Sequence, residues 1–134
     1  MSREETEDVV GRLYQAYAAM DVAVIDGLVG PEPVLHVSGA HPLSGEHRGK
    51  DAMWAYFGKV AEVSGGNGGF DVHAVTTDDA GHGVALLTGT IRDFVRPVIH
   101  VWHVHEGLLT EYWEANLDQQ AEDTFWTTAM ELGQ

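Results

Sequence analysis

A change in hydrophobic periodicity divides this chain into two halves. From Phe70 to Ala115, apolar and polar residues alternate through four segments: FDVHAVTTD, GVALLTGTIRDF, RPVIHVWHVH and LLTEYWEA. A period of two places successive side chains on opposite faces of a β-strand. Turn residues separate the segments, so this half of the chain predicts four strands joined by turns.

The N-terminal half shows helical spacing instead. Val10, Leu13, Tyr14 and Tyr17 recur three or four residues apart, which predicts a helix with one apolar face that ends near Asp21. The other predicted elements are a short helix from an N-cap at Asp21 to Gly30-Pro31, a strand over VLHV, a loop over SGAHPLSGEHRG, a helix over about 50–63 and a C-terminal helix in DQQAEDTFWTTAMEL.

Helices followed by a run of strands are typical of the α+β class. We expect a cone-shaped α+β barrel, in which a curved antiparallel sheet wraps around the N-terminal helices and leaves an open mouth. A length of 134 residues fits one domain, 1–134, and the sequence contains no internal repeat or linker.

Charge and composition exclude several kinds of partner. The chain has 7 Lys and Arg against 21 Asp and Glu and no basic patch, so we expect neither nucleic acid nor a membrane surface as partner. It also has no cysteine, which excludes disulfides and thiolate chemistry. The acidic N-terminus lacks the features of a signal peptide, and no apolar run could span a membrane, so a cytoplasmic protein is expected.

The hairpin IHVWHVHEGLLTEYWEAN concentrates three His, two Trp and three Glu. With the turn centred on Glu106-Gly107, the numbers of cross-strand partners sum to 213. This register places six residues on one face: His100, Trp102, Val104, Leu109, Glu111 and Trp113. His100 and Glu111 become diagonal neighbours within reach of a hydrogen bond. A slip of one residue in the register would exchange the faces of one strand.

Several segments together resemble the SnoaL-like branch of the nuclear transport factor 2-like superfamily, which includes polyketide cyclases and, more distantly, ketosteroid isomerases. These segments are YQAYAAMDVAVIDGLV, the strand ending LHVSG, HPLSGEHRGKDAMWAYF and EYWEANLDQQAEDTFW. The resemblance covers nearly the whole chain through the order and spacing of its parts.

The resemblance implies an apolar pocket between the first helices and the concave face of the sheet. It places His100 where the isomerases carry an inward oxyanion-binding acid, and it turns Glu111 and Trp113 toward the pocket. His36 lies where the isomerases have their catalytic aspartate, and their oxyanion tyrosine falls near Leu13, so the isomerase machinery is not repeated here.

His100, Glu111 and His36 are the predicted catalytic residues. Imidazole exchanges protons near neutral pH, and a carboxylate beside it in an apolar cavity can share acid and base roles with it. In that scheme His100 and Glu111 transfer the proton, and His36 orients or polarises a carbonyl group. The structural alternatives are a buried histidine bonded to a tyrosine or backbone carbonyl, a salt bridge at Glu111, and a pocket-wall histidine at His36.

Aromatic and aliphatic residues supply the predicted substrate-binding surface, which suits a flat apolar ligand. This set comprises Trp102, Trp113, Tyr17, Leu13, Val104 and Phe57.

The sequence predicts no metal site and no cofactor. His103 and His105 share a strand face and could contribute to a metal site if a third ligand joined them, and His36, His100 and Glu111 form the alternative trio. No HExxH motif or tight cluster of His and carboxylates is present.

The expected function is a cofactor-free acid/base enzyme, of the cyclase or isomerase type, acting on a small, mostly apolar carbonyl-bearing metabolite, for which natural-product biosynthesis is one setting. The alternatives are a non-catalytic binding module for a small ligand and an epoxide hydrolase with Glu111 activating water. We also expect a homodimer, because the other face of the hairpin carries Ile99, Val101 and Tyr112.

Overall fold

A computed structural model of the protein describes residues 2–131 and confirms the α+β class. The elements follow one another along the chain as α1 (Arg3–Ala18), α2 (Val22–Leu28), β1 (Val29–Val37), β2 (Gly45–Arg48), α3 (Lys50–Ser64), β3 (Gly68–Thr77), β4 (His82–Ile91), β5 (Phe94–His105), β6 (Leu108–Asn116) and α4 (Gln119–Glu131).

Local capping explains where the N-terminal helices begin. Ser2 and Glu5 form a reciprocal capping box at the start of α1, in which each side chain accepts the backbone N–H of the other residue. Asp21 caps α2 as predicted, because its carboxylate accepts the N–H of Val24 at 3.3 Å. The two caps set a long and a short helix in succession before the first strand.

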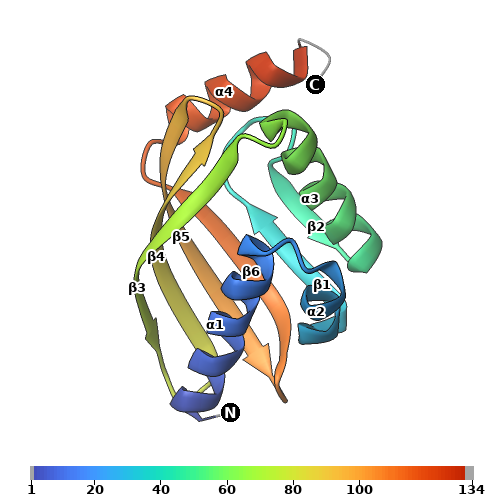
Figure 1. Cartoon of the computed structure of the whole chain (residues 1–134), viewed down its shortest axis with the longest axis vertical. Coiled ribbons are helices and arrows are strands. Elements are labelled where there is room, and N and C mark those ends of the chain that lie inside the picture. The colour runs from blue at the N-terminus through green and yellow to red at the C-terminus, as the bar shows by residue number, and fades with distance from the viewer. Residues whose placement is uncertain (1, 132–134) are drawn as a thin grey trace.

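The six strands form one curved, open sheet in the order β2-β1-β6-β5-β4-β3. Figure 1 shows α1 and α3 lying against the same side of this sheet, while α4 lies near the end of the molecule opposite to the N-terminus. All neighbouring strands are antiparallel except β1 and β6, which run parallel. The predicted sheet wrapped around N-terminal helices is therefore confirmed, with one parallel pairing.

The first strands differ most from the sequence prediction. β1 begins at Val29 rather than Val34, and β2 occupies part of the segment predicted as a loop. The side chains of β2 are exposed or half-buried, so its sequence GEHR carries no hydrophobic alternation. Backbone pairing with β1 defines this edge strand, and a pattern of side chains cannot reveal it.

A β-bulge at Thr110 shifts the register of the β5–β6 hairpin. Next to the turn, Val104 pairs with Leu109, as predicted. Beyond the bulge His103 pairs with Glu111 and His100 with Glu114, so partner numbers sum to 214 instead of 213. The Thr110 hydroxyl donates to the His103 carbonyl oxygen at 3.1 Å and so occupies a backbone acceptor beside the irregularity. The extra residue reverses the faces of the rest of β6.

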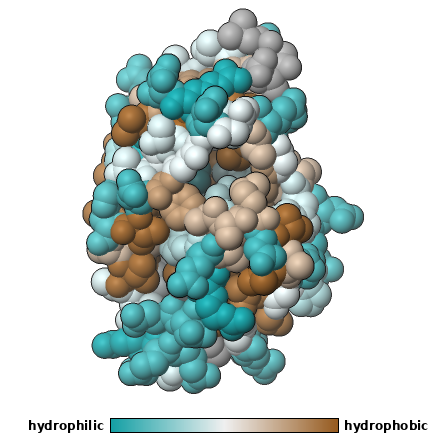
Figure 2. All heavy atoms as spheres, viewed as in Figure 1, coloured by the Kyte–Doolittle hydropathy of each residue, from teal (hydrophilic) through white to brown (hydrophobic). Residues whose placement is uncertain are grey.

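The core lies between the helices and the concave face of the sheet. Val10 of α1, Leu35 of β1, Met53 of α3 and Trp126 of α4 are among its most buried side chains. Figure 2 shows hydrophobic atoms gathered across the middle of the molecule, with hydrophilic atoms toward both ends. Within residues 2–131, no helix has the length and apolar character needed to cross a membrane.

Candidate functional site

A cavity of about 420 Å³ opens between the helices and the concave face of the sheet. α1 contributes Leu13 and Tyr17, α3 contributes Trp54 and Phe57, and Phe70 extends the aromatic wall from β3. Tyr17 contacts both Phe57 and Phe70, with ring centroids 5.4 and 5.7 Å apart. The size and the mostly apolar wall suit a small flat ligand.

A polar cluster of Tyr14, His100, Glu114 and Arg96 forms part of the cavity wall. Tyr14 projects from α1, Arg96 and His100 from β5, and Glu114 from β6. His100 and Glu114 are directly paired across the two strands, so the sheet register sets their proximity. His100 Nε2 lies 3.6 Å from Glu114 Oε1.

The hydrogen bonds assign the proton positions of this cluster. Trp102 Nε1–H donates to the Tyr14 hydroxyl oxygen at 3.0 Å, and that hydroxyl lies 2.7 Å from His100 Nδ1. We assign the imidazole proton to Nε2, which faces the ionised Glu114 carboxylate, so Nδ1 accepts the tyrosine O–H.

Arg96 balances the charge of Glu114. Its Nη2 donates to Glu114 Oε2 at 3.1 Å, and its Nε donates to Glu122 Oε1 at 2.9 Å. Glu122 comes from α4, is 1% exposed, and accepts the indole N–H of Trp126 at 2.9 Å. Through Glu122, helix α4 therefore holds the Arg96 guanidinium beside the carboxylate of Glu114. Each of these buried charges has a partner of opposite sign, without which its burial would be costly.

Burial and charge separate the proton affinities of the cluster. Burial lowers the pKa of His100, which keeps the imidazole neutral near neutral pH despite the nearby carboxylate. Burial raises the pKa of Glu114, but hydrogen bonding to His100 and the charge of Arg96 outweigh it and lower that pKa to about 2. Burial also raises the pKa of Tyr14, so its hydroxyl keeps its proton. The site combines a neutral imidazole, an ionised carboxylate and a protonated phenol.

The structure brings five of the predicted site residues to this cavity. These are His100, Trp102, Leu13, Tyr17 and Phe57. Val104 faces the same side of the sheet but is packed in the core, 1% exposed, and is not part of the cavity wall.

The prediction that His36, Glu111 and Trp113 share this cavity is wrong. They lie on the outer face of the sheet, where His36 Nε2 is 2.5 Å from Glu111 Oε2 and the imidazole stacks on Trp113 with centroids 5.0 Å apart. The bulge at Thr110 is the physical reason, because it turns Glu111 and Trp113 outward and Tyr112 and Glu114 inward.

Sequence reasoning missed Tyr14, Glu114 and Arg96 as site residues. In the sequence, Tyr14 is one residue of the apolar face of the predicted first helix, and the resemblance places the oxyanion tyrosine of the isomerases near Leu13 instead. The structure places the Tyr14 hydroxyl on His100. Arg96 gave a signal that could have been used, since a single arginine among the apolar residues and histidines of this strand needs an acidic partner.

The structure does not assemble the metal sites considered from the sequence. His36 and His100 lie on opposite faces of the sheet. His103 Nδ1 is instead 3.2 Å from the Thr110 hydroxyl, and His105 is exposed. Across the residues that the structure describes, no group of three or more His, Asp or Glu is arranged to hold a metal ion.

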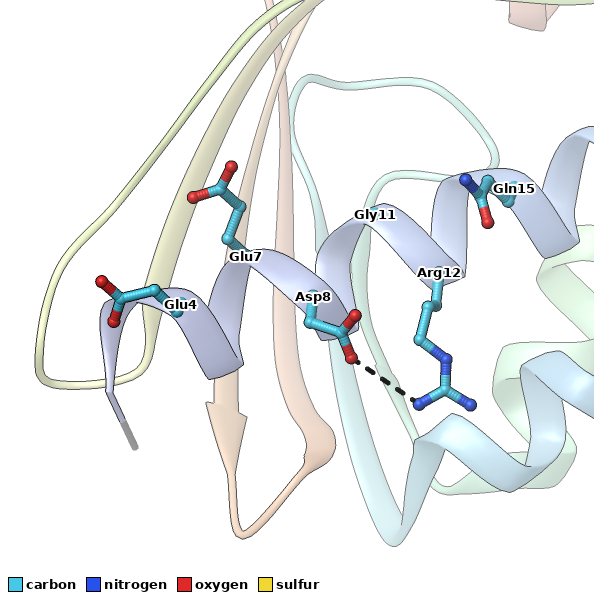
Figure 3. A pocket seen from close by; sticks show the side chains of 6 residues that line it. All are labelled: Glu4, Glu7, Asp8, Gly11, Arg12 and Gln15. Carbon is cyan, nitrogen blue, oxygen red and sulfur yellow. Dashed lines mark ion pairs between the residues drawn. The ribbon is translucent and has the colours of Figure 1, made fainter.

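A second hollow lies along the outside of α1. Figure 3 shows its lining side chains, which all come from this one helix, with the Asp8–Arg12 ion pair at 3.8 Å among them. Exposed side chains of a single helix provide no enclosing wall, so this hollow is a feature of the helix surface and not a ligand site.

Comparison with solved structures defines the class of protein. The chain shares its fold with Bal32a from a soil-derived mobile gene cassette, at 23% identity and a TM-score of 0.88 over 92% of this chain and 98% of that one. It is also similar to a nuclear transport factor 2-like protein from Burkholderia xenovorans LB400, at 19% identity and a TM-score of 0.74 over 92% and 98% of the two chains. A candidate ketosteroid isomerase from Kribbella flavida DSM 17836 has 13% identity and a TM-score of 0.68 over 85% and 78%. These likenesses define a nuclear transport factor 2-like fold.

The sequence identifies the family within that class. The profile of the SnoaL-like domain matches residues 10–112, which is well over half of the chain. The protein therefore belongs to the SnoaL-like family. No curated protein matches its sequence.

Proposed function

We propose that the protein is a cofactor-free acid/base enzyme, of the cyclase or isomerase type, that acts on a small, mostly apolar carbonyl compound. One observation supports this proposal above all others: His100 lies between the hydroxyl of Tyr14 and the carboxylate of Glu114 in the wall of an apolar cavity. A store for an apolar ligand gains nothing from burying such a group of ionisable residues.

In the proposed reaction, neutral His100 is the base. The ligand displaces the Tyr14 hydroxyl from His100 Nδ1, and Nδ1 then takes a proton from the carbon next to the carbonyl group. The electron pair of that C–H bond forms the enolate double bond, and the carbonyl π pair moves to oxygen. Glu114 stabilises the imidazolium through Nε2–H, and the released Tyr14 hydroxyl donates to the enolate oxygen.

The same geometry limits the alternatives. Epoxide hydrolysis was assigned to Glu111, and this residue lies on the outer face, where it cannot activate water for a ligand in the cavity. The ketosteroid isomerase likeness is a likeness of fold, and the proposal therefore names a reaction class and not a steroid substrate.

Hydrogen–deuterium exchange tests the proposal with a defined probe. 2-Acetylnaphthalene carries exchangeable methyl protons beside its carbonyl group, and their loss in D2O can be followed by proton NMR. We expect the protein to accelerate this exchange and His100→Ala to reduce the acceleration by about 10²–10⁴. The matched control, His36→Ala, changes the outer histidine and keeps the acceleration. Binding of the ketone without accelerated exchange would instead support the non-catalytic binding module.

We also propose that a second copy of the chain covers the part of the outer sheet face formed by β4 and β5, which leaves His36 and Glu111 of β1 and β6 in contact with solvent. Val84 and Leu86 are 42% and 41% exposed there, and cross-strand pairing places them beside Val101 and Ile99. The sequence predicts Tyr112 on this face, but the structure has Trp113 there, paired with Val101. Sedimentation at micromolar concentration should show a dimer, and Leu86→Lys should yield a monomer. A monomeric parent protein would refute the dimer.

A further inference from the structure

One edge of the Arg96 guanidinium group, at Nη1, has no hydrogen-bond acceptor among the described residues. Its Nε and Nη2 atoms donate to Glu122, Glu114 and Asn116. No described residue accepts a hydrogen bond from Nη1, although Arg96 is part of the cavity wall. His41 Nε2 is the only fully buried side-chain nitrogen or oxygen in residues 2–131 without a partner, so Nη1 is not sealed inside the protein.

Gly89 makes room for this edge. It pairs with Arg96 across β4 and β5 and also lines the cavity. A Cβ atom at position 89 would lie 3.3 Å from Arg96 Cγ and 3.5 Å from Nη1. The missing side chain therefore lets the guanidinium extend across the inner face of the sheet with Nη1 beside the cavity wall.

The charges around Arg96 determine which group can use this edge. The single guanidinium group of Arg96 forms ion pairs with two buried carboxylates, those of Glu114 and Glu122, which are 6% and 1% exposed. The formal charge of the trio is −1. A third carboxylate brought to Nη1 would meet net repulsion in a poorly solvated site, whereas a neutral carbonyl oxygen would accept the N–H without adding charge.

This edge is separate from the proposed reacting centre. The backbone positions of Arg96 and His100 lie four residues apart on β5, about 13 Å along a strand, but both side chains turn to Glu114, Arg96 through Nη2 and His100 through Nε2. Their remaining atoms Nη1 and Nδ1 lie on the sides that do not face Glu114, so the carboxylate lies between the two ligand positions. The β4 partners of Arg96 and His100, Gly89 and Ala85, repeat the spacing. A ligand that reaches both positions must therefore be elongated.

From this arrangement we infer that the substrate is an elongated, uncharged molecule with two oxygen functions, one at Tyr14 and His100 and a second, neutral one held by Arg96 Nη1 beside Gly89. The inference rests on the proposed function for the first oxygen. It adds Arg96 as a specificity-determining residue and Gly89 as the residue that gives the ligand access to it.

A ligand series tests the second position in the unaltered protein. The probes are 2-acetylnaphthalene, 2,6-diacetylnaphthalene and 6-acetyl-2-naphthoate, titrated into nitrogen-15-labelled protein and followed through the Trp102 indole signal. Because a hydrogen bond to a charged donor is worth about 1.5–3 kcal/mol, the diacetyl compound should bind about tenfold or more tightly than the monoacetyl compound. The naphthoate should bind more weakly than the diacetyl compound. Equal affinity of the mono- and diacetyl compounds, or a preference for the naphthoate, would overturn the inference.

Gly89→Ala tests the geometry without removing the buried charge. The added methyl group would lie 3.3 Å from Arg96 Cγ and 3.5 Å from Nη1, where it shifts the side chain by a few tenths of an ångström and covers Nη1, so the ratio of diacetyl to monoacetyl affinity should fall toward one. Gly58→Ala is the matched control, because Gly58 lies on α3 with nothing within 4 Å of its added Cβ, and the ratio should stay at its parent value. An unchanged ratio in Gly89→Ala would also contradict the inference. These titrations measure binding alone, so a failure of the proposed proton exchange gives a different result from a failure of the second oxygen site.

Discussion

Two histidine–glutamate pairs lie on opposite faces of the same sheet, and their surroundings differ more than their chemistry. His100 and Glu114 face the cavity with side chains 12% and 6% exposed, and Arg96 and Tyr14 complete their contacts. His36 and Glu111 face outward with side chains 25% and 35% exposed. The outer pair is the closer of the two, at 2.5 Å against 3.6 Å.

The comparison teaches that proximity alone does not mark a functional pair. Solvent screens the outer contact, and a solvated ion pair adds little to stability. The inner pair is removed from water, where its charges act strongly on one another and on a bound ligand. The predictions below separate the two pairs experimentally.

The largest expected difference is in proton exchange. Glu114→Gln keeps the shape of the side chain but removes the charge that stabilises the imidazolium, so exchange of 2-acetylnaphthalene protons should slow by about 10²–10⁴. Glu111→Gln makes the same chemical change on the outer face and should leave the exchange rate within about twofold of the parent. Equal losses in the two variants would mean that the inner pair has no special role.

A second large difference is expected in the free energy of unfolding. Arg96→Met leaves Glu114 and Glu122 buried without their cation, which should cost about 3–5 kcal/mol. His36→Gln removes the imidazole from a half-buried carboxylate that solvent still reaches and should cost less than about 1 kcal/mol. Urea unfolding followed by circular dichroism measures both. An Arg96→Met protein as stable as the parent would show that the buried cluster does not depend on its arginine.

The pH dependence of stability should depend on the inner histidine. Because burial lowers the pKa of His100, the unfolded chain binds a proton below its ordinary pKa of about 6.5 while the folded protein does not. Stability should therefore fall as the pH decreases from 6.5, by up to about 1.4 kcal/mol per pH unit for this residue. Unfolding curves between pH 5 and 7.5 should have a smaller slope in His100→Gln.

His41 provides the alternative source of the same slope, since burial also lowers its pKa. A slope that survives in His100→Gln but disappears in His41→Gln would assign the titration to the loop before β2 and not to the cavity.

The smallest expected effect is at the bulge that separates the two pairs. Thr110→Val removes the hydroxyl that donates to the His103 carbonyl oxygen and should cost about 1 kcal/mol in urea unfolding. Thr76→Val makes the same substitution at an exposed position of β3 and should change stability less. A loss of several kcal/mol in Thr110→Val would mean that the hydroxyl sets the register by itself.

Much of the fold was predictable because its signals are local. Apolar spacing of three and four residues located the helices α1 and α3, and alternation with a period of two located the four strands from Phe70 onward. Asp21 identified the start of α2. β2 escaped prediction because an edge strand with polar side chains has no hydrophobic pattern. The parallel pairing of β1 with β6 depends on contacts between distant segments, which no single segment encodes.

The site was harder to predict because its membership depends on one residue of register. His100, Trp102 and Leu13 were placed correctly, since they precede the bulge or lie outside the hairpin. Glu111 was placed in the position of Glu114 because Leu109, Glu111 and Trp113 alternate as regularly as Tyr112 and Glu114 do. Nothing in that alternation shows that Thr110 is the extra residue.

The bulge at Thr110 also bears on how proteins of this kind can diverge. Beyond it, successive residues of β6 belong in turn to the cavity and to the outer surface, so a point substitution can alter ligand chemistry or association with little effect on the other. One inserted or deleted codon that changes the register moves every later side chain of the strand to the opposite face. Substitution therefore adjusts the two faces separately, whereas a single insertion or deletion can exchange their roles in one step.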